Sequence, residues 1–242
     1  MNSVTKFLAC ACVGGLLAAA VLPAQAQVAP SAAEVAAYTG LHAAAQRGDA
    51  EEVRRLIAAG GNRDVRDAYG RTPLHVAAYA KRHDAIRALA QAGADLGALE
   101  RDRYDAVTIA AVANDEATLR LLLSLGASAR LTTSRYDGTA LIAAAHLGHA
   151  GVVRQLIAAG APLDHVNNLH WTAAIEAVVL GDGGARHQET LRALVEAGAN
   201  LQLADREGRT PLTLARERNY GDMVRLLEAA TGPHKNQAGN GA

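Results

Sequence analysis

The segment Thr72-Pro73-Leu74-His75-Val76-Ala77-Ala78, followed by Ile86-Arg87-Ala88-Leu89-Ala90-Gln91-Ala92-Gly93, decides the fold. Threonine is a common helix N-cap, and proline suits the first helical position because its missing N–H has no helical partner there. In the second stretch the apolar residues recur at helical spacing, and the closing glycine can adopt the left-handed conformation that ends a helix. Together the two stretches predict a pair of helices joined by a short loop.

Copies of this pair recur along the chain. The glycines that close the second helix are separated by 33, 33, 34 and 38 residues, and Val224-Arg225-Leu226-Leu227 is a sixth copy without the glycine. Asp105 stands where the other copies of the first helix have threonine, so we expect Asp105 to cap that helix. A fixed period of this length predicts stacked units that bury each other's apolar faces. The closing glycines are Gly60, Gly93, Gly126, Gly160 and Gly198.

A turn, a T-P-L-H-x-A helix, a short loop and a V-x-x-L-L-x-x-G-A helix at this period resemble the ankyrin repeat. The resemblance covers residues 39–231 and implies an all-α ankyrin-repeat solenoid of about six repeats with hairpin-like loops. It also implies that His42 and His75, at the histidine position of the first helix, tie neighbouring loops through hydrogen bonds. The expected repeats are 39–69, 70–102, 103–136, 137–168, 169–205 and 206–231.

The two ends of the chain differ from the repeats. Lys6, an uncharged run from Phe7 to Leu22 and the small-x-small sequence Ala24-Gln25-Ala26 predict a signal peptide, residues 1–26, that is cleaved after Ala26. A retained membrane anchor is the alternative, but this run is shorter than the roughly 20 apolar residues that a bilayer requires. We therefore expect a periplasmic or secreted protein without stable membrane insertion.

Further predictions concern the segments next to the repeats. Ser31-Ala32-Ala33-Glu34 has the spacing of a capping box, which predicts a short helix at 32–37, within an N-terminal capping segment 27–38 that covers the first repeat. Residues 232–242 have almost nothing to bury and are expected to be a disordered tail. Both cysteines, Cys10 and Cys12, lie in the leader, so the exported chain is expected to lack disulfides and thiolate sites.

Composition narrows the function further. The 24 Lys and Arg residues balance 24 Asp and Glu residues, which argues against the basic field needed for nucleic-acid binding. Half of the residues are hydrophobic but only 3% are aromatic, so alanine, leucine and valine are expected to form the core. The sequence has no phosphate loop, G-x-G-x-x-G, H-E-x-x-H or G-x-S-x-G motif, and we expect neither enzyme activity nor a cofactor or metal.

Aromatic residues lie near the predicted turn tips. Ankyrin proteins usually bind other proteins with these fingertips and with the inner helices, and Tyr and Trp provide large contact areas at low entropy cost. The resemblance therefore makes the tip residues candidates for contact with a partner protein; the alternative is that each ring packs onto its own hairpin. The candidates are Tyr69, Tyr104, Tyr136, His170 and Trp171.

The spacing of 38 residues places about five extra residues in repeat five, within the segment 180–189. Asp182, Arg186 and His187 are further candidates for partner binding there, and a purely structural loop is the alternative. If Asp182, His187 and Glu189 converged in a pocket, a ligand site or an enzyme would be favoured. A zinc site would require three neighbouring imidazoles, those of His146, His149 and His187.

One arginine recurs at the same position of every second helix. These side chains predict a ladder on the outer face, which is either a binding site for an acidic partner or a solvated stripe. The rungs are Arg54, Arg87, Arg120, Arg154, Arg192 and Arg225. The sequence as a whole predicts a monomeric, non-enzymatic protein–protein interaction module that binds or stabilises a partner protein in the bacterial periplasm. The alternative is a periplasmic inhibitor or immunity-like protein that occludes an enzyme.

Overall fold

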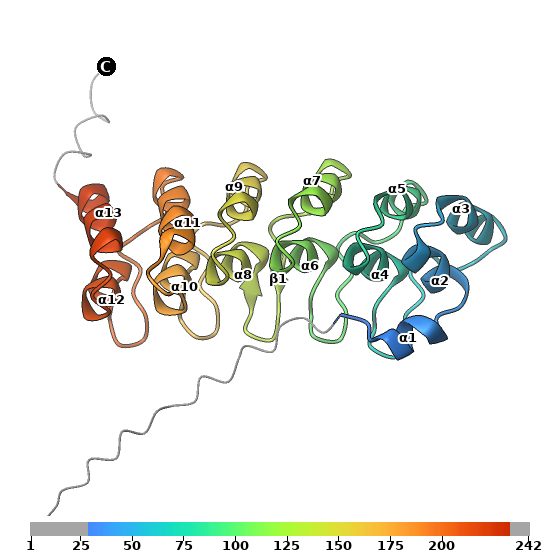
Figure 1. Ribbon diagram of the computed structural model, residues 1–242, viewed down its shortest axis with the longest axis horizontal. Helices are drawn as coiled ribbons and strands as arrows, with labels where there is room; N and C mark the ends of the chain where they lie inside the picture. The colour runs from blue at the N-terminus through green and yellow to red at the C-terminus, as the bar shows by residue number, and fades with distance from the viewer. Residues whose placement is uncertain (1–28, 233–242) are drawn as a thin grey trace, which may run out of the picture.

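The computed structural model describes residues 29–232, which form thirteen helices and one short hairpin (Figure 1). The predicted signal peptide, its cleavage site and nearly all of the predicted tail lie outside the described residues. The helices are α1 (Ala32–Ala37), α2 (Gly40–Arg47), α3 (Ala50–Ala58), α4 (Pro73–Tyr79), α5 (His83–Gln91), α6 (Ala106–Val112), α7 (Glu116–Ser124), α8 (Ala140–His146), α9 (Ala150–Ala158), α10 (Ala173–Val179), α11 (Ala185–Glu196), α12 (Pro211–Glu217) and α13 (Gly221–Thr231).

Helices α2 to α13 form six pairs that stand side by side in one row (Figure 1). The even-numbered helices, α2 to α12, are the inner helices, and the odd-numbered helices, α3 to α13, are the outer helices. Each inner helix packs against the outer helix of its own pair, and neighbouring inner helices pack against each other from α2 to α12. This arrangement confirms the solenoid that the period of the sequence predicts.

Side-chain caps start the inner helices as the sequence predicts. The hydroxyl groups of Thr72, Thr139, Thr172 and Thr210 accept a hydrogen bond from the backbone N–H three residues later. Asp105 takes this role in α6, where its carboxylate accepts from the N–H of Thr108 at 2.8 Å. At the first repeat Thr39 is the N-cap residue, but its side chain makes no capping hydrogen bond.

The five closing glycines end or follow the outer helices with positive φ, between 77° and 95°. Only a residue without a Cβ adopts this region at low cost, which explains why the same residue type recurs at the period of the fold. The core that the helices enclose consists mainly of alanine and leucine. Leu89, Leu122 and Leu156 of successive outer helices have no exposed surface.

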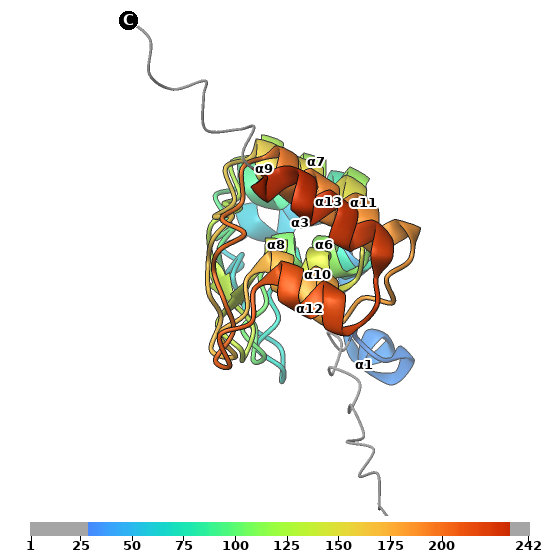
Figure 2. The same cartoon turned by 90° about the vertical axis from the view of Figure 1, so that its left-hand side faces the viewer.

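The loops between the pairs project to one side of the inner helices (Figure 2). In the loop before α8, Thr132–Thr133 (β1) and Gly138–Thr139 (β2) pair as antiparallel strands, with Thr132 opposite Thr139. Residues 29–232 contain no other strands. None of the helices in this part of the chain has the length and apolar character needed to cross a membrane.

The predicted N-terminal helix is present as α1. Ser31 and Glu34 form the capping box, with hydrogen bonds in both directions. None of the residues of α1 is buried. Figure 1 places α1 below α2, at the N-terminal end of the row of helix pairs.

Candidate protein-binding surface

Exposed apolar side chains are concentrated at the loops. Within residues 29–232, the large hydrophobic residues classed as exposed all lie in segments that connect an outer helix to the next inner helix. Their exposed fractions range from 37% for Val65 and Leu169 to 49% for Tyr136. We call these residues the loop-tip surface: Val65, Tyr69, Tyr136, Val166 and Leu169.

One polar side chain fixes the turn in each loop. Its oxygen accepts hydrogen bonds from the backbone N–H groups two and four residues later, at 2.8 and 2.9 Å for Asp67 and at 2.9 Å in both cases for Asn167. Such local acceptors hold a turn without help from sheet pairing. The residues in this role are Asp67, Glu100, Ser134, Asn167 and Asp205.

Backbone hydrogen bonds also join neighbouring loops. The N–H of Arg101 donates to the carbonyl oxygen of Tyr69 at 2.9 Å, and the N–H of Asn168 donates to that of Tyr136 at 2.9 Å. The tips are therefore fixed relative to one another, and a partner that binds several tips meets a preformed surface.

The predicted tip residues differ in their exposure. Tyr69 and Tyr136 are exposed, and so is His170, which has a φ of 66°. Tyr104 and Trp171 are half-buried and pack against the hydrophobic core, so most of their apolar area is already used within the fold. The sequence interpretation did not select Val65, Val166 or Leu169. The sequence feature that could have identified these three residues is an apolar residue within a segment that otherwise consists of turn-forming residues.

The ring of Tyr69 is held by two arginines. The guanidinium carbon of Arg71 lies 4.5 Å from the centroid of the ring, and that of Arg101 lies 5.3 Å from it. Both distances are within the range of a cation–π contact. Tyr69 is thus presented in a fixed position although it is 42% exposed.

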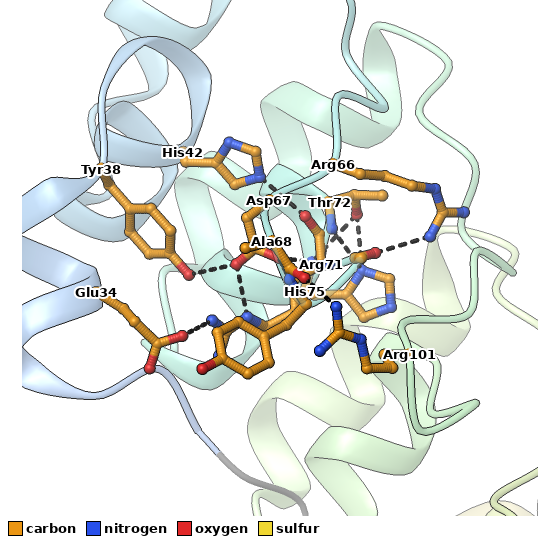
Figure 3. A network of polar contacts seen from close by, with 12 residues as sticks. Glu34, Tyr38, His42, Arg66, Asp67, Ala68, Arg71, Thr72, His75 and Arg101 are labelled. Atoms are coloured by element: carbon orange, nitrogen blue, oxygen red, sulfur yellow. Dashed lines mark hydrogen bonds and ion pairs between the residues drawn. The ribbon is translucent and has the colours of Figure 1, made fainter.

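Arg71 is the centre of a buried polar network (Figure 3). Its side chain is 2% exposed and forms ion pairs with Asp67, at 2.7 Å, and with Glu34 of α1. The hydroxyl group of Tyr38 donates to Asp67 at 2.9 Å. Burial acts to raise the pKa of Asp67, but the hydrogen bonds from Arg71, Tyr38 and the backbone outweigh it and lower this pKa. The network ties α1 to the loop before α4.

His42 and His75 have the structural role that the resemblance implies. Nε2 of His42 lies 2.9 Å from the carbonyl oxygen of Arg71, and Nε2 of His75 lies 3.1 Å from that of Tyr104. Each histidine thereby connects its helix to the loop of the following repeat. Burial lowers the pKa of His75 to about 4, so this ring is neutral at pH 7.

The insertion in repeat five is a structural joint. It lengthens α11 to twelve residues, whereas α3, α5, α7 and α9 have nine. His187 is 4% exposed; Nδ1 contacts Asp182 at 3.1 Å, and Nε2 lies 3.0 Å from the carbonyl oxygen of His146. On the other side, the hydroxyl group of Tyr220 donates to the carbonyl oxygen of Gly181 at 3.0 Å. The insertion therefore connects repeats four, five and six.

This geometry changes the interpretation of the ionisable residues in the insertion. His187 is buried, whereas Asp182 and Arg186 are exposed and remain accessible to a partner. Glu189 does not join Asp182 and His187 but faces Arg154 at 3.5 Å. Within residues 29–232 there is no group of three His, Cys, Asp or Glu residues arranged to hold a metal ion. In particular, His149 and His187 use ring nitrogens to bind backbone carbonyl groups.

The arginine ladder is exposed along the outer helices, and four of its rungs have acidic neighbours. Arg54 pairs with Glu51, Arg120 lies 3.9 Å from Glu116, and Arg225 pairs with Asp222. Arg154 is the fourth, beside Glu189. These contacts favour the solvated stripe, because local carboxylates offset the positive charge.

Comparison with known proteins gives the same family for sequence and structure. The family model described as "Ankyrin repeats (3 copies)" matches residues 8–100 and 107–202. The putative ankyrin repeat protein YahD of Escherichia coli K12 is 34% identical over 188 residues, covering 77% of this chain and 93% of YahD. An ankyrin repeat domain from Acinetobacter baumannii AYE has 42% identity and a TM-score of 0.73, covering 78% of this chain and 96% of that domain.

A further solved structure is also similar to this chain. The ankyrin repeat domain of Bcl-3, a member of the IkappaB protein family, has 28% identity and a TM-score of 0.72, covering 81% of this chain and 87% of that domain. The helix pairs of this chain agree with these structural matches. The chain belongs to the ankyrin repeat family.

Proposed function

We propose that this protein is a scaffold of the bacterial periplasm that binds and stabilises a partner protein through the loop-tip surface and the inner helices. Ankyrin repeat domains are generally protein–protein interaction modules, and the family is typically non-enzymatic. The observation that carries the proposal is the concentration of exposed apolar residues at the loop tips. Exposed apolar side chains gathered on one edge are typical of a protein-binding site.

Rigid presentation is the proposed mechanism of binding. The loops are fixed by their own side-chain acceptors and by hydrogen bonds between neighbouring loops, so little conformational entropy is lost on association. Tyr69, Tyr136 and Leu169 would supply apolar contact area, and the exposed His170 and Arg186 would supply polar contacts. The predicted signal peptide supports the periplasmic location, and the relatives from Escherichia coli K12 and Acinetobacter baumannii AYE support a bacterial setting.

Crosslinking in the native cell envelope followed by mass spectrometry tests the proposal. The double variant Tyr136→Ala, Leu169→Ala is expected to lose the partner that the wild-type protein captures. The matched control, Arg87→Ala with Arg192→Ala, alters exposed residues of the outer helices and is expected to retain it. Equal capture by all three proteins would contradict binding at the loop tips. The intact mass of the exported protein tests the location, because cleavage after Ala26 leaves Gln27 as the first residue.

A further inference from the structure

The loop before α10 lacks an ion pair that two other loops contain. In the loops before α4 and α12, the acid that fixes the loop pairs with an arginine four residues later: Asp67 with Arg71 at 2.7 Å, and Asp205 with Arg209 at 2.8 Å. Asn167 and Trp171 occupy these two positions in the loop before α10. The side chain of Asn167 still accepts from two backbone N–H groups, so the turn is kept while both charges are absent.

A carboxyl group instead lies one turn inside the inner helix of repeat five. Glu176 of α10 is 4% exposed, and its Oε1 accepts from Nδ2 of Asn167 at 3.0 Å. Its Oε2 is buried and accepts no hydrogen bond, the one carboxyl oxygen of residues 29–232 for which this holds. Val76, Ile109 and Leu214 are the buried residues at the equivalent position of other inner helices, so the fold does not require a carboxyl group there.

His146 covers this oxygen. It is the last residue of α8, its side chain is 29% exposed, and its Nδ1 lies 3.2 Å from Oε2 of Glu176, an ion-pair contact when the imidazole is protonated. Among the hydrogen bonds and ion pairs of the described residues, this contact is the only one that the imidazole makes. Rotation of one partly exposed side chain would therefore open Oε2 to a donor from outside. Oε2 accepts no hydrogen bond in the present arrangement, and a buried acceptor without one is costly, which favours such an exchange.

We infer that Glu176, Asn167 and His146 form a receiving site for an arginine side chain of the partner protein, an inference that rests on the proposed protein-binding function. The fold itself supplies the precedent, because Arg71 and Arg209 pair with the carboxylates in the loops before α4 and α12. A guanidinium group has donors on a rigid planar fork and pairs with a carboxylate in a defined geometry, which an ammonium group does not. In repeat five the partner provides the arginine that the chain lacks.

The site can be tested with a defined probe, the peptide Gly-Gly-Arg-Gly-Gly with blocked ends. Trp171, the single tryptophan, is the reporter, because its backbone N–H and carbonyl groups both bond to Asn167. We expect the arginine peptide to shift the NMR signal of the Trp171 indole N–H and to bind at least about tenfold more tightly than its citrulline analogue. Citrulline has nearly the same shape without the charge.

Three variants of the full exported protein complete the test. Glu176→Gln is expected to weaken binding about tenfold, equivalent to about 1.4 kcal/mol, while Glu189→Gln, which alters an exposed glutamate of the same repeat, leaves binding unchanged. His146→Ala is expected to strengthen binding because it removes the cover. A structural role of Glu176 alone would not produce this pattern. Urea unfolding checks that each variant is folded.

Several results would overturn the inference. Equal binding of the citrulline peptide or of a lysine peptide would reject recognition of a guanidinium group, and unchanged binding by Glu176→Gln would reject the site. Weaker binding by His146→Ala would show that the imidazole is a ligand and not a cover. If free L-arginine bound tenfold more tightly than the peptide, the ligand would be a small molecule. Loss of partner capture in the loop-tip variant but not in Glu176→Gln would reject the arginine site and retain the protein-binding function.

Discussion

Replacement of Arg71 by methionine is expected to destabilise the protein more than the same replacement of Arg209. Methionine fills a similar volume without the charge. Both arginines pair with the acid four residues earlier, but Arg71 is 2% exposed and Arg209 is 39% exposed. Removal of one partner from a buried ion pair leaves the other charge buried, at a cost of about 3 to 5 kcal/mol. Both changes leave a buried acid, because the side chain of Asp67 is 10% exposed and that of Asp205 is 1% exposed. Water can reach the place of the partly exposed Arg209 and hydrate Asp205, but it cannot reach the place of Arg71.

The structure refines this magnitude. After the change Asp67 keeps three donors, the hydroxyl group of Tyr38 and the N–H groups of residues 69 and 71, which reduces the cost. Glu34 loses its ion pair and Tyr69 loses one cation–π contact, which increases it. Asp205 keeps two backbone N–H donors after Arg209→Met, which limits that cost. We expect a loss of about 3 kcal/mol in the free energy of unfolding for Arg71→Met and of about 2 kcal/mol for Arg209→Met.

Urea unfolding followed by far-ultraviolet circular dichroism measures both losses. The double variant Asp67→Asn, Arg71→Met is expected to lose less than the sum of the single variants, because neither charge is then left unpaired. The pKa of Asp67 is lowered in the folded protein, so its contribution is present above the unfolded-state pKa near 3.8 and is lost as the pH falls through the folded-state value. The difference between wild type and Arg71→Met should therefore shrink in acid. Equal losses for Arg71→Met and Arg209→Met would refute this reasoning.

Three further predictions concern the histidine, the insertion and the core. Because the pKa of His75 is about 4 in the folded protein, the free energy of unfolding should fall by up to about 3 kcal/mol as the pH drops from 6.5 towards 4. The variant His75→Gln should remove that part of the pH dependence. An NMR titration should find His75 neutral at pH 6. Gly183→Ala should cost about 2 kcal/mol in urea unfolding, because φ is 71° and a Cβ would lie 2.5 Å from the ring of Tyr220. Gly208→Ala should cost about 1 kcal/mol, because φ is 75° but a Cβ there would enter open space. Equal costs would contradict close packing between the insertion and Tyr220. Leu122→Ala should lower the free energy of unfolding by about 3 kcal/mol because the side chain of Leu122 is fully buried. Leu169→Ala at the loop tip should leave the melting temperature nearly unchanged. The reverse order of stability would contradict the assignment of core and surface.

Much of the fold was predictable because each helix start and end depends on neighbouring residues. The hydroxyl group of Thr72 reaches an N–H three residues away, and Gly93 ends its helix through its own backbone conformation. Asp105 was recognisable as a cap for the same reason. The place of α1 was less predictable, because it depends on contacts of Glu34 and Tyr38 with residues about thirty positions later in the chain.

The candidate surface was only partly predictable. The position near the turn tips indicated Tyr69 and Tyr136 correctly as exposed. The same position holds Tyr104 and Trp171, whose rings pack against the core, so sequence position alone does not separate the two groups. Val65, Val166 and Leu169 were missed because an apolar residue usually signals burial, and only the direction of the loop exposes it. His187 was a plausible contact residue until the structure placed it between Asp182 and the backbone of His146.

The sequence by itself determined the repeating unit, its number and the ends of its helices, since periodicity, caps and glycines act over a few residues. The tertiary structure decided which side chains remain free. Exposure and the pairing of charges depend on how one repeat lies on the next, over separations of about one period. The same position in the loop thus holds an ion-paired carboxylate at Asp67 and an uncharged amide at Asn167, beside a glutamate whose second oxygen accepts no hydrogen bond.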